Sequence, residues 1–197
     1  MSDRSASVTR DTNETQIRLE LSIDGTGSSE IATGVGFFDH MLTHIAKHGM
    51  LDLKVRAKGD LEVDAHHVVE DVGIVLGRAI AQAVGDKAGI VRYGWALCPM
   101  DEALVGVALD LSGRSYLNFD LKLGPAQVGE FDTELALEFF RAVAANAAMT
   151  LHVWQQYGRN AHHIIEAAFK AFGRALDEAT RIDPRRAGDL PSTKGTL

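Results

Sequence analysis

The sequence has little of what a secreted, membrane-spanning or nucleic-acid-binding protein needs. Its 197 residues include one cysteine, Cys98, which excludes an internal disulfide framework and fits a reducing compartment. The formal net charge of -7 argues against the basic surface that binds nucleic acid. No run approaches the roughly 20 apolar residues that span a bilayer, and the N-terminus lacks the apolar segment of a signal peptide. We therefore expect a cytoplasmic protein without a membrane segment.

What the sequence does contain is a His-His-x-x-Glu motif that occurs twice, at 66–70 and at 162–166. Each copy follows a residue suited to a helix N-cap, Asp64 or Asn160, and leads into an apolar periodic run. Both motifs should therefore occupy the first turns of long helices. Residues four apart share a helix face, whereas the second histidine of each motif turns aside by about 100°.

Each motif thus offers a histidine–glutamate pair on one face and one divergent imidazole. Imidazole and carboxylate together suit Mn, Fe, Ni or Zn. Because the third side chain diverges from the first two, it indicates a second metal centre. A solvated helix start is the alternative interpretation of a single motif. The duplication makes that alternative the weaker one.

The two motifs end similar series of predicted elements. The first half is predicted to contain a strand over 17–23 with a hairpin turn at 25–27, a helix over 37–49, a strand over 51–57 and the first motif's helix to about 84. The second half is predicted to contain strands over 95–98, 103–111 and 116–123, a helix over 133–148, a strand over 149–155 and the second motif's helix. We therefore expect an α+β fold with an internal duplication, in halves over 1–88 and 89–184 with a tail over 185–197.

The duplication extends the set of candidate ligands. When the strand at Leu53 is aligned with the strand at Leu151, His40 and Glu138 become counterparts, each thirteen residues earlier. Eight ligands would supply two metals with four each. The predicted ligands are His40, His66, His67, Glu70, Glu138, His162, His163 and Glu166.

Other histidines allow competing interpretations. His40, His44 and His48 recur at a spacing of four residues and could form a separate site on one helical face, but we favour His40 as a ligand with the other two lining the pocket. His152 is opposite in phase to the apolar residues of its strand, so we interpret it as a surface or interface side chain.

Several polar residues at the ends of predicted elements suggest an anion site. Guanidinium, ammonium, hydroxyl and glycine-freed amide groups together match a phosphate. No Walker-type loop is present, and each residue alone could be a solvated charge. The set comprises Arg92, Arg114, Lys170, Ser192 and Lys194.

Six stretches together resemble the imidazoleglycerol-phosphate dehydratase family. They are FDHML at 38–42, the two His-His-x-x-Glu motifs, PMDEA at 99–103, DLSGR at 110–114 and PSTKG at 191–195. The likeness runs from about residue 10 to the C-terminus in the family's order. It implies a lyase of histidine biosynthesis that removes water from D-erythro-imidazoleglycerol phosphate to give imidazoleacetol phosphate, with two Mn²⁺ ions per subunit.

The resemblance also implies an architecture. It predicts two four-stranded sheets with helices, a fold of the ribosomal protein S5 domain 2-like type, and trimers packed into a cubic 24-subunit shell with metal sites between subunits. The sequence departs from the family at Glu138, where some members carry histidine, and at Thr193, where serine is common. The first departure puts one metal ligand in question, and the second keeps the hydroxyl.

The reaction that the resemblance implies removes a proton from a carbinol carbon with no neighbouring carbonyl. The imidazole ring must therefore supply the driving force, through a metal-bound imidazolate that expels the adjacent hydroxyl and gives a diazafulvene-like intermediate. The first candidates for general acid–base catalysis are Glu14 and Glu166, and the next are His48 and Asp101. We expect the substrate to contact Glu14, His40, His66 and His67 as well as the phosphate set.

Two other function classes remain open from the motifs alone. A metal-storing or metal-sensing oligomer without catalysis needs no phosphate site. A metallohydrolase would use the same metals to activate water.

Overall fold

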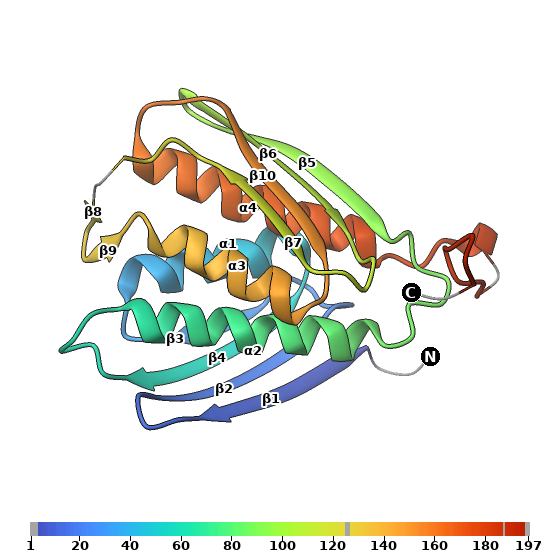
Figure 1. The fold of residues 1–197 in the computed structure, drawn as a ribbon, viewed down its shortest axis with the longest axis horizontal. Coiled ribbons are helices and arrows are strands. Elements are labelled where there is room, and N and C mark those ends of the chain that lie inside the picture. The colour runs from blue at the N-terminus through green and yellow to red at the C-terminus, as the bar shows by residue number, and fades with distance from the viewer. Residues whose placement is uncertain (1–3, 125–126, 187, 196–197) are drawn as a thin grey trace.

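The computed structural model describes residues 4–124, 127–186 and 188–195. Within them the chain forms two four-stranded sheets with four α-helices between the sheets (Figure 1). The first half comprises β1 (Ser5–Asp11), β2 (Thr15–Ser22), β3 (Ser29–Ala32), α1 (Gly36–Gly49), β4 (Asp52–Gly59) and α2 (His66–Val84). The second half comprises β5 (Tyr93–Met100), β6 (Ala103–Asp110), β7 (Tyr116–Asp120), α3 (Leu135–Asn146), β10 (Thr150–Tyr157) and α4 (Ala161–Thr180). A short hairpin of β8 (Gln127–Val128) and β9 (Phe131–Asp132) precedes α3, and a 3-10 turn (Pro184–Arg186) follows α4.

The predicted α+β fold and its duplication are confirmed by the topology of the two sheets. Their strand orders are β1-β2-β4-β3 and β5-β6-β10-β7, so every strand of one sheet has a counterpart in the other. In both sheets the third strand pairs antiparallel to the second and parallel to the fourth. Alternating residues of the central strands face the helices because side chains of a strand point to opposite faces in turn.

The helices of one half pack on the helices of the other, α2 on α3 and α1 on α4. Both crossings depend on a glycine. A Cβ built on Gly77 would lie 2.7 Å from the Val143 carbonyl oxygen, and one on Gly173 would lie 2.7 Å from the Ile45 carbonyl oxygen. A buried group of phenylalanines, Phe139, Phe140, Phe169 and Phe172, fills the centre of the helix layer.

The expected hairpin turn at 25–27 is wrong. The hairpin partner of β2 is β1, with the turn at 12–14, and the segment after β2 leads to β3, which lies parallel to β4. The pattern did not reveal β1 because Val8 is its one buried residue, or β3 because it has four residues. No helix in the described parts of the chain is long and apolar enough to cross a membrane.

Candidate metal and substrate site

The second motif begins α4 and forms a compact cluster with a histidine of α1. The Asn160 side chain accepts a hydrogen bond from the His162 amide at 3.0 Å, which starts the helix at the motif. Glu166 Oε2 lies 3.1 Å from His162 Nε2 and 3.4 Å from His40 Nε2. Each of these three residues offers a ligand atom within 4.8 Å of the others. The predicted pairing of His162 with Glu166 and the contribution of His40 to the same cluster are both present.

Glu166 is buried and remains ionised because cations and donors surround it. Its other oxygen, Oε1, lies 2.6 Å from Lys170 Nζ and 3.3 Å from His44 Nε2. Burial raises the pKa of Glu166, but the Lys170 hydrogen bond and the neighbouring charges outweigh burial and lower the pKa to about 2. Burial also lowers the pKa of His44 to about 4, so its imidazole is neutral at neutral pH.

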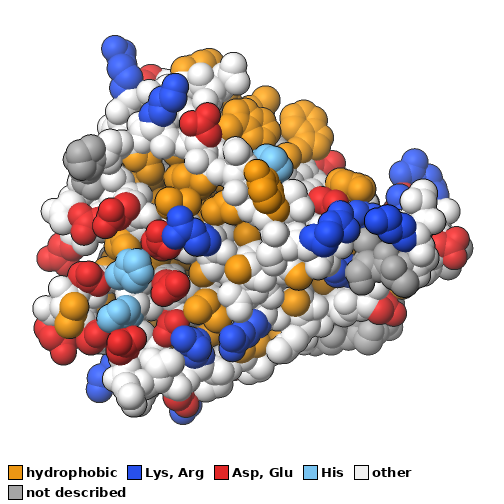
Figure 2. All heavy atoms as spheres, in the orientation of Figure 1, with side chains coloured by type: hydrophobic (Ala, Val, Ile, Leu, Met, Phe, Trp, Pro, Cys, Tyr) orange, Lys and Arg blue, Asp and Glu red, His pale blue; other side chains and the backbone are white. Residues whose placement is uncertain are grey.

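The first motif begins α2 and is more open. His66 Nε2 lies 3.9 Å from Glu70 Oε2, on the shared helix face that the spacing predicts. Glu138, the predicted counterpart of His40, forms an ion pair with Arg141 on its own helix, at 2.6 Å. Figure 2 shows histidine side chains among aspartates and glutamates at the end of the molecule where α2 begins.

The second histidine of each motif contacts a different carboxylate from the first. The ring planes are inclined at 87° for His66 and His67 and at 81° for His162 and His163. Each divergent ring is held through Nδ1, by Asp60 at 3.0 Å from His67 and by Glu102 at 2.7 Å from His163. Both pairings raise the pKa of the imidazole, through its hydrogen bond to the carboxylate.

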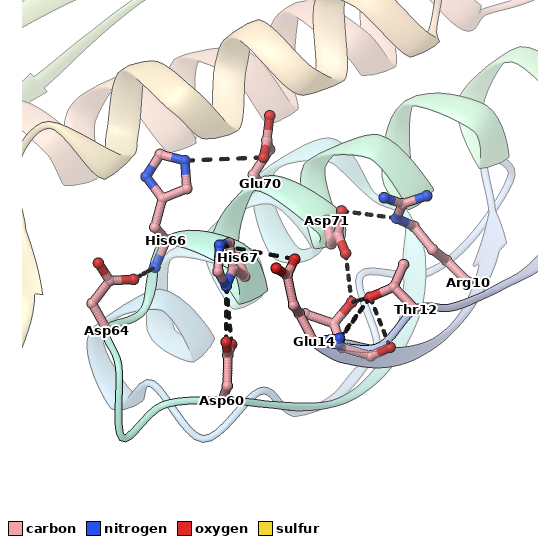
Figure 3. Close-up of polar contacts among 10 residues, drawn as sticks. Arg10, Thr12, Glu14, Asp60, Asp64, His66, His67, Glu70 and Asp71 are labelled. Atoms are coloured by element: carbon pink, nitrogen blue, oxygen red, sulfur yellow. Dashed lines mark hydrogen bonds and ion pairs between the residues drawn. The ribbon is translucent and has the colours of Figure 1, made fainter.

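The opposite nitrogen, Nε2, of each divergent ring faces a further carboxylate. Glu14 Oε2 lies 3.9 Å from His67 Nε2 (Figure 3), and Asp101 Oδ2 lies 3.6 Å from His163 Nε2. The structure therefore brings the predicted acid–base residues Glu14 and Asp101 beside the predicted ligands. His48 lies one turn after His44 on α1, with the two ring centroids 5.6 Å apart, and lines a groove with Trp95 and Arg174.

A buried aspartate fixes the turn that carries Glu14 (Figure 3). Asp71 on α2 accepts hydrogen bonds from Arg10 Nε at 2.8 Å and from the Thr15 hydroxyl at 2.5 Å. Thr12 Oγ1 in turn accepts from the amides of Glu14 at 3.2 Å and Thr15 at 2.9 Å. The helix that holds the first motif therefore also holds the hairpin turn beside it.

Most of the predicted phosphate set lies at the other end of the molecule. The Arg92 amide donates to the Ala179 carbonyl, at the last turn of α4, at 2.8 Å. The histidines stand at the first turn of that helix, about 25 Å away at 1.5 Å per residue. Lys and Arg side chains gather near the C-terminal tail, across the view from the two histidine side chains that lie among acidic ones (Figure 2).

Within that distant group the side chains have different contacts. The Arg92 guanidinium forms two hydrogen bonds with the Asp110 carboxylate, at 2.6 and 3.0 Å, and one with the Pro191 carbonyl at 2.7 Å. Arg114 follows β6 in an exposed loop, and the Ser192 hydroxyl accepts from the Lys194 amide at 3.2 Å. Arg92 thus fastens the tail that carries Ser192 and Lys194, while Lys170 stays with the histidine cluster.

Three carboxylates near the motifs were not predicted as functional from the sequence: Asp60, Asp71 and Glu102. His44 was predicted to line the pocket, but its contact with Glu166 was not predicted. Asp71 had a visible signal, because it is a charged residue within an apolar helical run. Glu102 lies in the PMDEA stretch that carries the family resemblance, whereas Asp60 had no signal, and nothing in the spacing of either residue indicates which imidazole it would meet.

Comparison with known proteins gives one consistent result. The family model for imidazoleglycerol-phosphate dehydratase matches residues 33–176. The imidazoleglycerol-phosphate dehydratase of Acetivibrio thermocellus is 65% identical over 195 residues, 99% of this chain and 100% of that protein. The crystal structure of the dehydratase from Staphylococcus aureus has a TM-score of 0.81 at 47% identity, covering 89% of this chain and 97% of that one. The structure from Pyrococcus furiosus, in complex with (S)-C348, has a TM-score of 0.84 at 39% identity, covering 96% of this chain and 100% of that one.

Proposed function

The chain belongs to the imidazoleglycerol-phosphate dehydratase family and is a dehydratase of histidine biosynthesis, and from this premise we propose that it holds two Mn²⁺ ions per subunit. We propose further that it acts in the cytoplasm as a homo-oligomer of trimers in a cubic 24-subunit shell. The residues that we assign to the metals are His40, His66, His67, Glu70, Glu138, His162, His163 and Glu166.

The observation that carries the metal proposal is the cluster of His40, His162 and Glu166, whose ligand atoms lie within 4.8 Å of one another. Two imidazole nitrogens and one carboxylate oxygen form a donor set that suits Mn²⁺. The two oxygens of Glu166 have separate partners, since Oε2 faces His40 and His162, and Oε1 faces Lys170 and His44. The cluster therefore fits a cation without giving up the ion pair with Lys170.

A site shared between subunits is supported by the divergent imidazoles. His67 and His163 turn away from the clusters of their own motifs. A histidine that leaves its own cluster is free to serve a different metal, whose remaining ligands we assign to another chain. In a closed homo-oligomer every copy would both give and receive such a ligand.

The separation of the phosphate set supports the same conclusion. Imidazoleglycerol phosphate is far shorter than the roughly 25 Å between the first and last turns of α4. One chain cannot hold the substrate's ring with its histidines and the phosphate with Arg114, Ser192 and Lys194. We therefore assign the ring and the phosphate to different subunits of one site.

The residues around such a substrate would have distinct tasks. When bound, Mn²⁺ would supply Lewis-acid polarisation of the imidazole ring. Glu14, beside His67 Nε2, would take the proton from the carbinol carbon, and Glu166 and Asp101 are the other carboxylates within reach of a histidine cluster. The phosphate set would turn remote binding energy into orientation of the reacting carbons.

The test is metal content per subunit measured together with ketone formation, in chelated protein and in protein reloaded with Mn²⁺. We expect about two Mn²⁺ per subunit and recovery of imidazoleacetol phosphate formation on reloading. Full activity in chelated protein would contradict the metal proposal. Release of inorganic phosphate in place of the ketone would point to hydrolysis.

A further inference from the structure

The two divergent histidines are held in the same way by residues that are not counterparts. His67 contacts the Asp60 carboxylate through Nδ1, with both oxygens at 3.0–3.1 Å. His163 contacts Glu102 Oε2 through Nδ1 at 2.7 Å. Asp60 follows β4, whereas Glu102 lies in the turn between β5 and β6.

The register of the sheets identifies the true counterpart of each carboxylate. Leu21 of β2 pairs with Leu53, and Leu109 of β6 pairs with Leu151, so β2 and β6 superpose from their first residues. The residue before β2 is Glu14 and the residue before β6 is Glu102. Glu14 and Glu102 are therefore counterparts, although one faces Nε2 of its histidine and the other binds Nδ1.

Glycine packing identifies the counterpart of Asp60. A Cβ on Gly59 would meet Thr15 and Val68, and a Cβ on Gly158 would meet Ala103 and Ile164, which are the equivalent positions of the second half. The residue after Gly59 is Asp60, and the residue after Gly158 is Arg159. The second half thus has no carboxylate where the first half has Asp60.

An ionised carboxylate can only accept hydrogen bonds, so it selects the imidazole tautomer that carries its proton on Nδ1. That tautomer leaves the lone pair on Nε2, the nitrogen that would bind a metal. Glu102 is held in this role because its Oε1 accepts from the amides of Arg159 at 3.1 Å and Asn160 at 2.8 Å. The hydrogen bond to His163, followed by these two, lowers the pKa of Glu102 to about 2.

We propose that Asp60 and Glu102 are positioning residues that fix His67 and His163 as Nε2 metal ligands. In the second half Glu102 contacts Nδ1 of His163. In the first half Asp60 contacts Nδ1 of His67, so Glu14, the counterpart of Glu102, lies on the Nε2 side of that ring. This inference rests on the proposed metal sites.

The proposal can be tested by comparing the amide variant with the alanine variant at each of the two positions. The expected ranking of their Mn²⁺ affinities differs between position 60 and position 102. In Glu102→Gln the carbonyl oxygen stays with the amides of residues 159 and 160, so the NH₂ group faces Nδ1 and favours the tautomer that is protonated on Nε2. Within the described residues no backbone amide donates to the Asp60 carboxylate, so in Asp60→Asn the side chain can turn its carbonyl oxygen toward Nδ1. Asp60→Asn should therefore keep the Mn²⁺ affinity that Asp60→Ala loses. Glu102→Gln should bind Mn²⁺ no more tightly than Glu102→Ala.

The measurement is Mn²⁺ affinity of the full-length protein, by EPR titration of free Mn²⁺, with melting temperature as a check of folding. We expect a loss of about 10–100-fold in Glu102→Gln and in Asp60→Ala, the range for residues that support metal ligands. Asp60→Asn should stay close to the parent protein. The matched control is Glu20→Gln, a surface carboxylate that lies 3.9 Å from Lys54 Nζ.

A purely structural role makes the opposite prediction at position 102, because Gln keeps the contacts to residues 159 and 160 and Ala removes them. Tighter Mn²⁺ binding in Glu102→Gln than in Glu102→Ala would therefore overturn the proposal, as would parent-like affinity in all four variants. Failure of the parent protein to bind Mn²⁺ would remove the metal sites on which the proposal rests.

Discussion

The two copies of one motif differ in what surrounds them. The Glu166 side chain is 6% exposed and is in contact with Lys170 and three histidines, whereas the Glu70 side chain is 45% exposed and faces His66. The difference comes from the neighbours, because α1 presents His40 and His44 to α4. Four residues after the glutamate the second half has Lys170 and the first half has Ile74. A duplicated motif therefore gives two sites of unequal preorganisation.

The largest effect should come from neutralising the glutamates of the two motifs separately. Glu166→Gln removes the central negative charge of a cluster that is assembled within one chain and replaces one acceptor oxygen with a donor, so we expect Mn²⁺ affinity to fall at least about 100-fold. Glu70→Gln should lower Mn²⁺ affinity less, because its side chain is exposed and lies 3.9 Å from a single histidine, His66. Competition titrations with a chelator measure both. Equal losses would show that the surroundings of the two glutamates do not matter.

The second-largest effect should come from removing Lys170, the cation that has no equivalent in the first half. Lys170→Ile gives the second motif the residue of the first and leaves Glu166 buried without its ammonium partner, 2.6 Å away. We expect the metal-free protein to lose about 3 kcal/mol of unfolding free energy, and Mn²⁺ to restore most of it because a cation again faces the carboxylate. Thermal unfolding with and without Mn²⁺ tests this. An equal loss in both states would contradict the account.

A third effect should be the same in both halves. Gly77→Ala and Gly173→Ala each place a methyl group 2.7 Å from a carbonyl oxygen of the facing helix. Because backbone must shift to admit the methyl, we expect each variant to lose about 2 kcal/mol of stability. The control is Gly36→Ala, since nothing lies within 4 Å of its Cβ position. Gly85→Ala is unsuitable, because the backbone of Gly85 has φ +63°, a conformation that strains alanine. Unequal losses at 77 and 173 would mean that the two helix crossings differ.

The same contrast explains what could be predicted from the sequence. Spacing within one helix fixes which side chains share a face, so the pairs His162–Glu166 and Glu166–Lys170 and the divergence of His163 were predictable. Contacts between elements were not, because Asp60 and Glu102 reach their histidines across turns whose geometry no periodicity encodes. The strand β1 was missed for a related reason, since a polar edge strand lacks the alternation that marks a half-buried one.

The sequence also could not predict where the fold places the members of the phosphate set. Its members were grouped by chemical type, and the fold divides them, with Lys170 beside Glu166 and Arg92 beside Asp110 and Pro191. Their joint role at one phosphate stays a prediction. It requires neighbouring subunits to bring the two ends of the chain together.

The smallest effect should separate proton transfer from metal binding in the first half. Asp71→Asn weakens the link from α2 to Arg10 and Thr15, which holds the turn carrying Glu14, without touching a predicted ligand. If Glu14 moves the proton, a turn that is less well placed should lower kcat about tenfold while KM and Mn²⁺ affinity stay unchanged. The second half has Ala167 at the equivalent position, so no such clamp exists there. Asn13→Ala, in the same turn, is the matched control. A parallel fall in Mn²⁺ affinity would show instead that Asp71 supports the motif and not the turn.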